Sequence, residues 1–158
     1  MVPSKKRQRR PLYVRANRAS NNRNTSDAVD YEALARFRYE LRKFQAFSKT
    51  AANKKGLTPQ QHQALLSIRG FSSRDPISVG DLAEFLLIRH HTAVELIDRM
   101  TKLGLLSRIV DETDGRRVLV KLTKEGGRRL RELSRIHLEE LRAIGPTLAK
   151  ILKPFRRS

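Results

Sequence analysis

The sequence contains no cysteine and only nine aromatic residues among its 158 positions. The lack of cysteine excludes disulfides, thiol redox sensing and thiolate zinc sites, and it is compatible with a reducing cytoplasm. No apolar run approaches the roughly 20 residues that a transmembrane helix needs. The basic N-terminus is not followed by the apolar segment of a secretory signal. These absences predict a cytoplasmic protein that has no membrane partner.

Acidic residues are scarce as well. The chain has 16 Asp and Glu against 34 Lys and Arg, which gives a formal net charge of +18 and a pI of about 11.3. Such an excess predicts a polyanionic partner, either nucleic acid or an anionic surface. An RNA-binding platform is the weaker alternative, because the few aromatic residues lie mostly at core spacing and leave little to stack on single-stranded bases. No nucleophile–base arrangement, phosphate loop or metal-ligand spacing is present, so we expect neither an enzyme nor a cofactor.

The start of the chain concentrates positive charge, with eight Lys and Arg and no acid in the first 26 residues. A segment of this composition cannot bury enough apolar surface to offset the entropy lost on ordering. We therefore interpret residues 1–28 as a disordered basic arm. Two roles for the arm stay open: it follows DNA phosphates or lies in a minor groove, or it is a solubilising tail.

Residues 29–56 have the pattern of one long amphipathic helix. Leu34, Phe37, Leu41 and Phe44 recur at spacings of three, four and three, which places them on one face, and Gly56 marks the end. This apolar seam is too large to be covered by a small domain. Exposed seams of that size usually mark a partner surface, and the simplest partner is a second copy of the chain.

Residues 57–123 contain the signals of a helix-turn-helix and a hairpin. Thr58 and Gln61 form a capping box for one helix, and Ser78 caps the next. A further helix begins at residues 89–92, with Ala93 and Ile97 on its core side, so two short helices are joined by a tight turn. The run 105–110, the loop 111–117 and the alternating run 118–122 then predict a β-hairpin.

Residues 124–158 read as C-terminal helices. Thr123 caps a long helix, Gly145-Pro146 is expected to break it, and a short amphipathic helix is expected to follow. The predicted fold is therefore mostly α with a small β-hairpin. It is a winged helix-turn-helix with long N- and C-terminal dimerisation helices, and residues 57–123 form the DNA-binding lobe.

The wing segment also carries a resemblance to a known family. Asp114-Gly115-Arg116, followed by Leu122-Thr123 and preceded by the helix-turn-helix, resembles the MarR (multiple antibiotic resistance regulator) transcription factors over roughly residues 30–155. The resemblance implies a homodimeric regulator, more often a repressor than an activator, that binds double-stranded DNA at a pseudo-palindromic operator. It also implies a small, often aromatic and acidic effector, bound between the dimerisation helices and the DNA-binding lobe, that releases DNA.

The hairpin tip supplies the first candidate DNA contacts. The resemblance implies that Arg116 enters a minor groove and that Asp114 fixes its direction. A paired carboxylate does hold a guanidinium in one orientation, and narrow minor grooves attract arginine. Arg117 is expected to touch a phosphate or to solvate the wing. The alternative for Arg116 and Asp114 is an exposed ion pair of little energetic weight.

The exposed side of the helix that starts near residue 90 supplies the second group. In a helix-turn-helix the N-terminal part of this helix meets base edges in the major groove. The expected contacts are Arg89, His90, His91, Thr92, Val94, Glu95 and Arg99. The alternative is a solvated polar face. A metal shared by His91 and Glu95 is disfavoured, because no further ligands cluster with them.

Charge alone also allows another function. A winged-helix protein without an effector can coat DNA without sequence preference, as architectural or nucleoid proteins do. The segment 89–117 holds six basic and five acidic residues, so it is nearly neutral. We expect this segment to give register and specificity, and we expect the bulk of the attraction to DNA to come from elsewhere in the chain.

Overall fold

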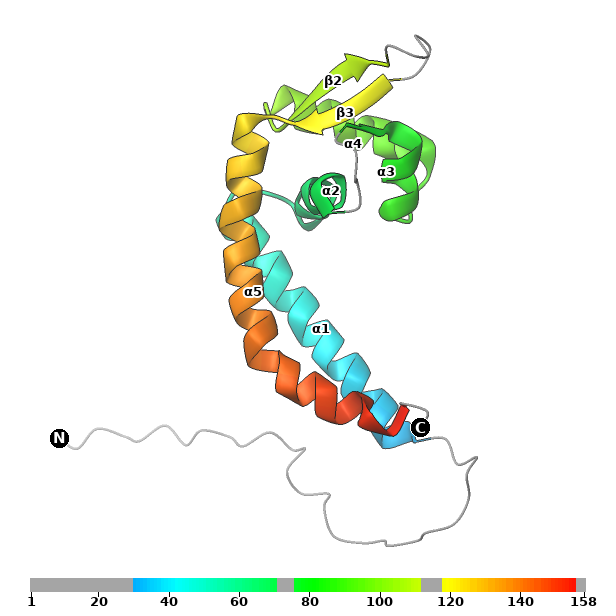
Figure 1. The fold of residues 1–158 in the computed structure, drawn as a ribbon, viewed down its shortest axis with the longest axis vertical. Helices are drawn as coiled ribbons and strands as arrows, with labels where there is room; N and C mark the ends of the chain where they lie inside the picture. The colour runs from blue at the N-terminus through cyan, green and yellow to red at the C-terminus, as the bar shows by residue number, and fades with distance from the viewer. Residues whose placement is uncertain (1–29, 71–75, 112–117, 156–158) are drawn as a thin grey trace, which may run out of the picture. The chain divides into compact units, whose positions relative to one another are not determined.

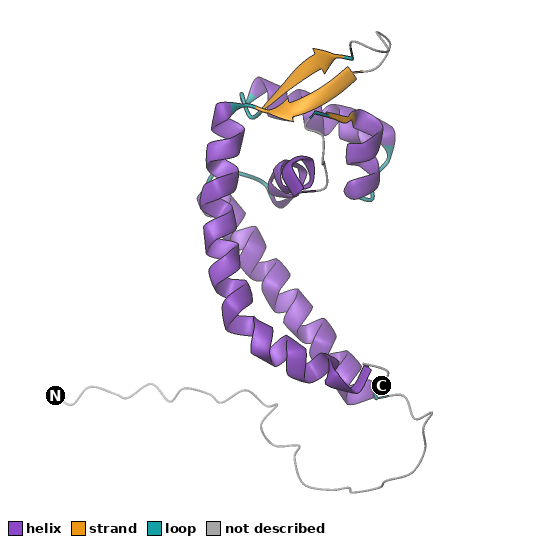
Figure 2. Cartoon of the chain, viewed as in Figure 1, coloured by secondary structure: helices purple, strands orange, loops and turns teal. Residues whose placement is uncertain are grey.

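The computed structural model describes residues 30–70, 76–111 and 118–155. Helix α1 spans Tyr31–Lys54 and α2 spans Pro59–Gly70. The elements that follow are strand β1 (Ile77–Ser78), helices α3 (Val79–Phe85) and α4 (His90–Lys102), strands β2 (Leu106–Val110) and β3 (Val118–Leu122), helix α5 (Lys124–Leu152) and the 3-10 turn η2 (Lys153–Phe155). Figures 1 and 2 show this order. It confirms the predicted fold class, a mostly α winged helix. The basic arm predicted for residues 1–28 lies outside the described residues.

The sheet has three antiparallel strands in the order β1-β3-β2. The hairpin β2–β3 pairs Leu106 with Leu122 and Val110 with Val118, as the alternation predicted. Strand β1 was not predicted. It has only two residues, too few to show alternation, and it exists because Ile77 pairs with Val120 from a distant part of the chain.

The helix starts follow the capping signals in the sequence. The backbone N–H of Thr58 donates to the Gln61 side chain at 2.8 Å, and the Gln61 N–H donates to Thr58 Oγ1 at 3.2 Å. Ser78 and Asp81 form the same reciprocal pair at the start of α3. Thr123 Oγ1 accepts the N–H of Gly126 at 3.0 Å and starts α5. Each pair satisfies donors that the first helical turn leaves without partners.

The predicted break at Gly145-Pro146 is wrong, because α5 continues through Pro146 to Leu152. Figure 1 shows α5 as one curved helix. A proline inside a helix removes one backbone hydrogen bond, to the carbonyl four residues earlier. That residue is Arg142, which is exposed, and Pro146 is exposed too. Water can therefore solvate the freed carbonyl, and the helix bends rather than ends.

Two regions of the described chain differ in how they pack. The lobe consists of α2, the sheet, α3, α4 and α5 up to Leu133. It surrounds a core that includes Leu65, Ile68, Leu82 and Ile97, all fully buried. The stalk consists of α1 and residues 134–152 of α5, which run side by side in opposite directions (Figure 1). None of the helices in the described residues is long and apolar enough to cross a membrane.

Candidate DNA-binding surface

The helix-turn-helix is formed by α3 and α4, which are joined by a tight turn at residues 86–89. Leu87 N–H donates to Glu84 O and Ile88 N–H donates to Ala83 O, both at 3.0 Å. This pair of bonds is the Schellman motif, whose central residue adopts a left-handed backbone. Leu87 has a φ of +53° and its side chain is 92% exposed. A leucine therefore stands where glycine is usual.

Helix α4 is anchored by its inner face. Ala93, Ile97 and Met100 are fully buried, and they hold α4 against the rest of the lobe. The face that the sequence predicted to meet DNA points outward. Of the predicted contacts, Arg89, His90, His91, Glu95 and Arg99 are exposed, while Thr92 and Val94 are half-buried. The structure thus places six of these residues on α4 outside its buried face, with Arg89 at the N-cap position before the helix.

Ion pairs restrain part of this face. Arg99 lies 3.8 Å from Glu95 one turn earlier on α4, and Arg108 of β2 lies 2.5 Å from Asp98. Both pairs are exposed, so each adds little to stability. They pair both acids of α4 with arginines. Because α4 carries two acids and two Lys or Arg residues, it has no net charge. Within the described residues no group of three or more potential ligands gathers around a metal position.

The wing is described only in its strands. Val110 and Val118 form the last pair before the tip. Asp114, Arg116 and Arg117 lie in residues 112–117, outside the described residues, so their predicted roles rest on the sequence alone.

Comparison with known proteins agrees with this arrangement. A family model described as the MarR family matches residues 55–117, which run from the start of the lobe to the wing. The lobe of this chain, from the start of α2 to the wing, is therefore similar to the MarR family.

The relatives extend the comparison across the fold. The transcriptional activatory protein BadR of Rhodopseudomonas palustris is 37% identical over 76 residues, which make up 48% of this chain and 43% of BadR. The match therefore spans less than half the length of that relative. A mutant of MepR from Staphylococcus aureus, solved with a bound oligodeoxyribonucleotide, is 20% identical with a TM-score of 0.61 over 82% of this chain and 100% of that chain.

NadR, solved in complex with 4-hydroxyphenylacetate, is 24% identical with a TM-score of 0.61, over 82% of this chain and 88% of that chain. At these identities the two solved structures establish the shared MarR-type fold of this chain and no more.

A buried histidine pair lies where α1, α2 and α5 meet, and sequence reasoning did not single it out. The rings of His62 and His137 are 4.6 Å apart between centroids, and both side chains are buried. His137 Nδ1 donates to Leu133 O at 2.8 Å, because a carbonyl can only accept, so Nε2 accepts from Ser48 Oγ at 2.9 Å. His62 Nδ1 is buried with no partner among the described residues. Burial, and then the nearby His137, lower the pKa of His62 from 6.5 to about 4.

The first turns of α5 carry a compact charge network. Arg128 and Arg129 both donate to the Glu125 carboxylate, and these hydrogen bonds lower its pKa to about 2. Arg128 also pairs with Glu132, which lies 3.4 Å from Lys55 Nζ of the loop after α1. This network occupies one side of α5. Other basic residues of the same helix lie outside it.

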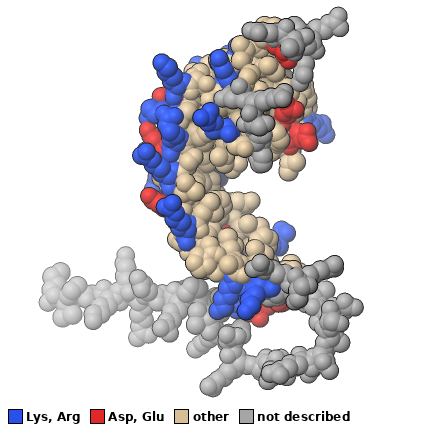
Figure 3. Space-filling model, in the orientation of Figure 1, with Lys and Arg blue, Asp and Glu red and all other residues tan. Residues whose placement is uncertain are grey.

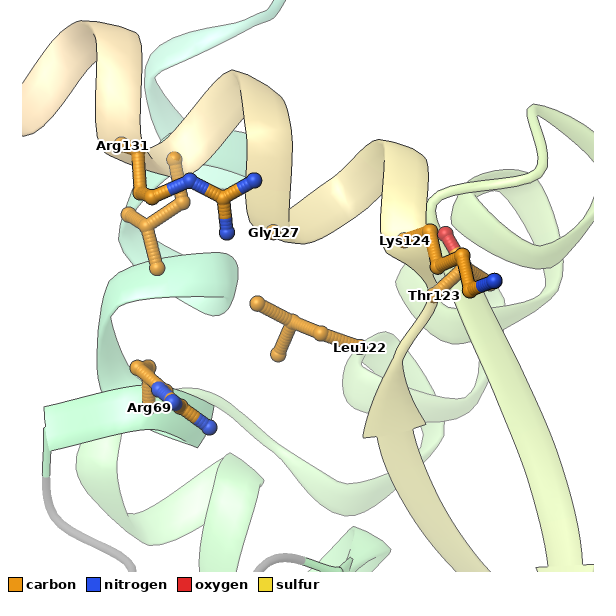
Figure 4. Close-up of a pocket in the computed structure, with 7 residues that line it drawn as sticks. Arg69, Leu122, Thr123, Lys124, Gly127 and Arg131 are labelled. Carbon is orange, nitrogen blue, oxygen red and sulfur yellow. The ribbon is translucent and has the colours of Figure 1, made fainter.

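A pocket of about 480 Å³ opens beside these turns, between α2, β3 and α5. Arg69, Lys124 and Arg131 line it together with the apolar side chains of Leu122 and Leu130. Figure 4 shows Leu122 extending toward the space between Arg69 on α2 and Arg131 on α5. No acidic residue is among the described residues that line the pocket.

Proposed function

We propose that this chain is a sequence-specific, MarR-type regulator of transcription that binds double-stranded DNA as a homodimer. The observation that supports this best is the outward face of α4, which is held on a fully buried inner face. In such a dimer the two α4 helices would enter successive major grooves about 34 Å apart, which implies a pseudo-palindromic operator. The MepR mutant bound to an oligodeoxyribonucleotide supports DNA as the ligand class.

The proposed contacts divide between two grooves. His90, His91 and Thr92 lie in the first turn of α4, nearest to base edges in the major groove. Val94 would meet a thymine methyl group, and Glu95 would accept from a cytosine amino group. Arg89 and Arg99 are proposed as further contacts at the two ends of this face. Arg116 of the wing, directed by Asp114, is proposed for the minor groove, with Arg117 on a phosphate.

The proposed dimer interface is the stalk. Its far end exposes large apolar side chains that a second copy would cover. These side chains are Tyr31, Leu34, Tyr39, Leu41, Leu138, Leu141, Leu152 and Phe155. In this proposal residues 57–123 contact the operator, while apolar side chains within residues 29–56 and 124–158 join the two copies and leave the cations of α5 exposed.

The outcome of binding is proposed as repression, relieved by a small acidic aromatic effector. The complex of NadR with 4-hydroxyphenylacetate supports this effector class. An effector that prefers the free dimer would lower the affinity for DNA by the factor with which DNA lowers effector affinity. A promoter fused to a reporter gene distinguishes repression from activation, the role that BadR is named for.

Selection of duplexes from a random pool tests the central claim. We expect enrichment of a two-fold site about two helical turns long. No enrichment, together with tight binding that falls steeply with salt, would instead support an architectural protein that coats DNA.

Two variants of the protein test the proposed DNA contact of the wing and the proposed dimer interface. Arg116→Ala is expected to weaken binding to the selected duplex strongly in a gel shift, while Arg128→Ala, which removes an exposed and ion-paired arginine, is expected to leave it unchanged. Leu41→Lys should produce a folded monomer by analytical ultracentrifugation, because it places charge in the apolar seam. An unchanged dimer would contradict the proposed interface.

A further inference from the structure

The proposed recognition helix carries no net charge to attract DNA. Helix α4 has two acids and two Lys or Arg residues, whereas α5 has four acids and seven Lys or Arg residues. Nucleic-acid affinity comes largely from cations that neutralise phosphates. Helix α1 has two acids and six Lys or Arg residues, so the described part of the chain has most of its excess positive charge on α1 and α5, outside the helix-turn-helix.

Four of the α5 cations lie along one line of the helix. Lys124, Arg131, Arg135 and Arg142 are spaced by seven, four and seven residues. At about 100° and 1.5 Å per residue they fall within about 40° of arc and extend over about 27 Å. We refer to these four residues as the α5 basic stripe. Figure 3 shows Lys and Arg side chains along the edge of the molecule formed by α5, with acidic side chains between some of them.

The stripe is available to a partner in a way that its neighbours are not. All four of its side chains are exposed, and none forms an ion pair with an acid in the described part of the chain. Arg128 and Arg129, on the adjoining side of α5, are paired with Glu125. Helix α5 therefore carries ion-paired arginines on one side and, on the adjoining side, arginines that form no ion pair within the described residues.

The α5 basic stripe begins beside a pocket. Lys124 and Arg131 line the pocket of about 480 Å³, with Arg69 of α2 on its opposite side. Three cations from two helices converge there on a space that no acid lines among the described residues. This arrangement suits a group with delocalised negative charge, such as a phosphate diester, because guanidinium groups bind phosphate oxygens in pairs.

The position of the stripe indicates which phosphates it would meet. Strand β3 of the wing ends at Leu122, and Lys124 begins α5 two residues later. The stripe therefore starts at the base of the wing. An anionic membrane fits less well, because a flat surface over the stripe would also approach Glu125 and Glu132 beside it, whereas a single backbone strand is narrow enough to avoid them.

We propose that the α5 basic stripe is a second DNA contact, which binds the sugar–phosphate backbone of the duplex that continues beyond the operator. The proposal rests on the proposed function, because it requires an operator contacted by α4 and the wing. It assigns the bulk electrostatic attraction to a surface that reads no bases.

The test compares two equal losses of charge. One triple variant carries Arg131→Gln, Arg135→Gln and Arg142→Gln. The matched control carries Arg38→Gln, Arg42→Gln and Lys49→Gln, which removes three exposed charges from α1. Each protein is titrated at several salt concentrations with two probes. The short probe is the selected duplex of about 20 bp, and the long probe places that duplex between random flanks about two helical turns long.

On the long probe the stripe variant should lose up to about 5.4 from the log–log slope of affinity against salt, because each of the two copies loses three cations and each neutralised phosphate contributes about 0.9. On the short probe it should match the wild type, and the control should match the wild type on both. Unchanged melting temperatures and dimer masses for both variants keep the comparison valid.

Several results would overturn the proposal. An equal loss of slope in the control variant would show that only net charge matters. An equal loss on the short probe would place the contact within the operator. A loss seen only when a second, separate duplex is added would show that the stripe bridges two DNA molecules. Absence of operator binding by the wild type would refute the proposed function itself, which the wild-type titration reports independently of either variant.

Discussion

The lobe and the stalk share helix α5 but differ in how completely the chain buries their apolar side chains. In the lobe, Ile68, Leu82 and Ile97 are completely buried by side chains of the same chain. In the stalk, Tyr39 is 55% exposed and Leu138 is 51% exposed, although both belong to regular helices. The lobe is therefore complete as a packed unit, whereas the stalk exposes apolar surface that a monomer would leave in water.

The residues buried in each region lead to the same conclusion. All buried residues of α5 lie between Gly126 and His137, in its first half. Helix α1 buries mainly Ala33, Ser48, Ala51 and Ala52, which are small. Small buried side chains let two helices approach closely but supply little hydrophobic free energy. Closely packed elements thus support α4, whereas the stalk retains the apolar surface that the proposed second copy would cover.

The largest predicted effect concerns the closeness of packing where α5 enters the lobe. A Cβ atom on Gly126 would lie 2.1 Å from the backbone oxygen of Leu105, which is closer than two non-bonded atoms can approach. Gly126→Ala must therefore push α5 away from the end of α4, and we expect it to lower the free energy of unfolding by about 3 kcal/mol or more. Urea denaturation followed by circular dichroism measures the change.

The adjacent glycine provides the control. A Cβ on Gly127 would meet only the flexible end of Arg131, at 3.4 Å. Gly127→Ala should therefore stabilise α5 by up to about 1 kcal/mol through helix propensity. If Gly126→Ala and Gly127→Ala were equally stable, α5 would not be closely packed against Leu105. That result would contradict the difference in packing between the lobe and the stalk.

The next effect concerns the joint between lobe and stalk, where His62 of α2 meets His137 of α5. Burial lowers the pKa of His62 from 6.5 to about 4. The unfolded chain then binds this proton first as pH falls, so the contribution of His62 is complete above pH 6.5 and is lost progressively down to about pH 4. We expect the wild type to lose at most about 3 kcal/mol of unfolding free energy across this window.

His62→Phe should remove this part of the acid sensitivity while it keeps an aromatic ring beside His137. The Glu125 carboxylate, whose pKa is lowered from 4.5 to about 2, also loses its contribution as pH falls below about 4.5, but it is present in both proteins and cancels in the comparison. Urea denaturation at a series of pH values from above 6.5 to about 4 compares the two proteins. An identical pH dependence would show that His62 is hydrated at the joint rather than held neutral by burial.

The fold followed from the sequence wherever local signals decided the structure. The capping pairs Thr58–Gln61 and Ser78–Asp81 fixed helix starts, and the alternation in residues 118–122 predicted β3. The failures have a common cause, which is that the environment outweighed a local preference. Strand β1 depends on a distant partner strand, and Pro146 is tolerated because its surroundings are exposed.

The candidate site was predictable in part for the same reason. Periodicity placed Ala93 and Ile97 inside and so placed Glu95 outside. The spacing of the α5 basic stripe is also visible in the sequence, but which arginines of α5 are neutralised depends on rotamers that no spacing reveals. His62 was overlooked because a histidine on an amphipathic helix reads as polar surface, and only the packing of α5 against α2 shows that it is buried.

The smallest predicted effect concerns the turn of the helix-turn-helix, where a leucine of the otherwise closely packed lobe is exposed and has a left-handed backbone. Two other helix ends have the same pair of hydrogen bonds, and there the left-handed position is occupied by Gly56 and Gly104. Leu87 occupies the third such position. A left-handed backbone costs a leucine about 1–2 kcal/mol, and glycine loses part of that advantage through greater freedom in the unfolded chain.

Leu87→Gly should therefore raise the free energy of unfolding by about 0.5–1 kcal/mol, whereas Gly104→Leu, the reverse change at a matched turn, should lower it. Thermal unfolding of the two variants beside the wild type measures both. Because the Leu87 side chain is 92% exposed, its loss removes almost no packing, so a destabilised Leu87→Gly protein would mean that the strain is absent. If Leu87→Gly were more stable but bound the selected duplex more weakly, stability and DNA binding would favour different residues at this turn. Such an outcome would show that the lobe retains one strained, exposed leucine at the turn before α4 because DNA binding requires it.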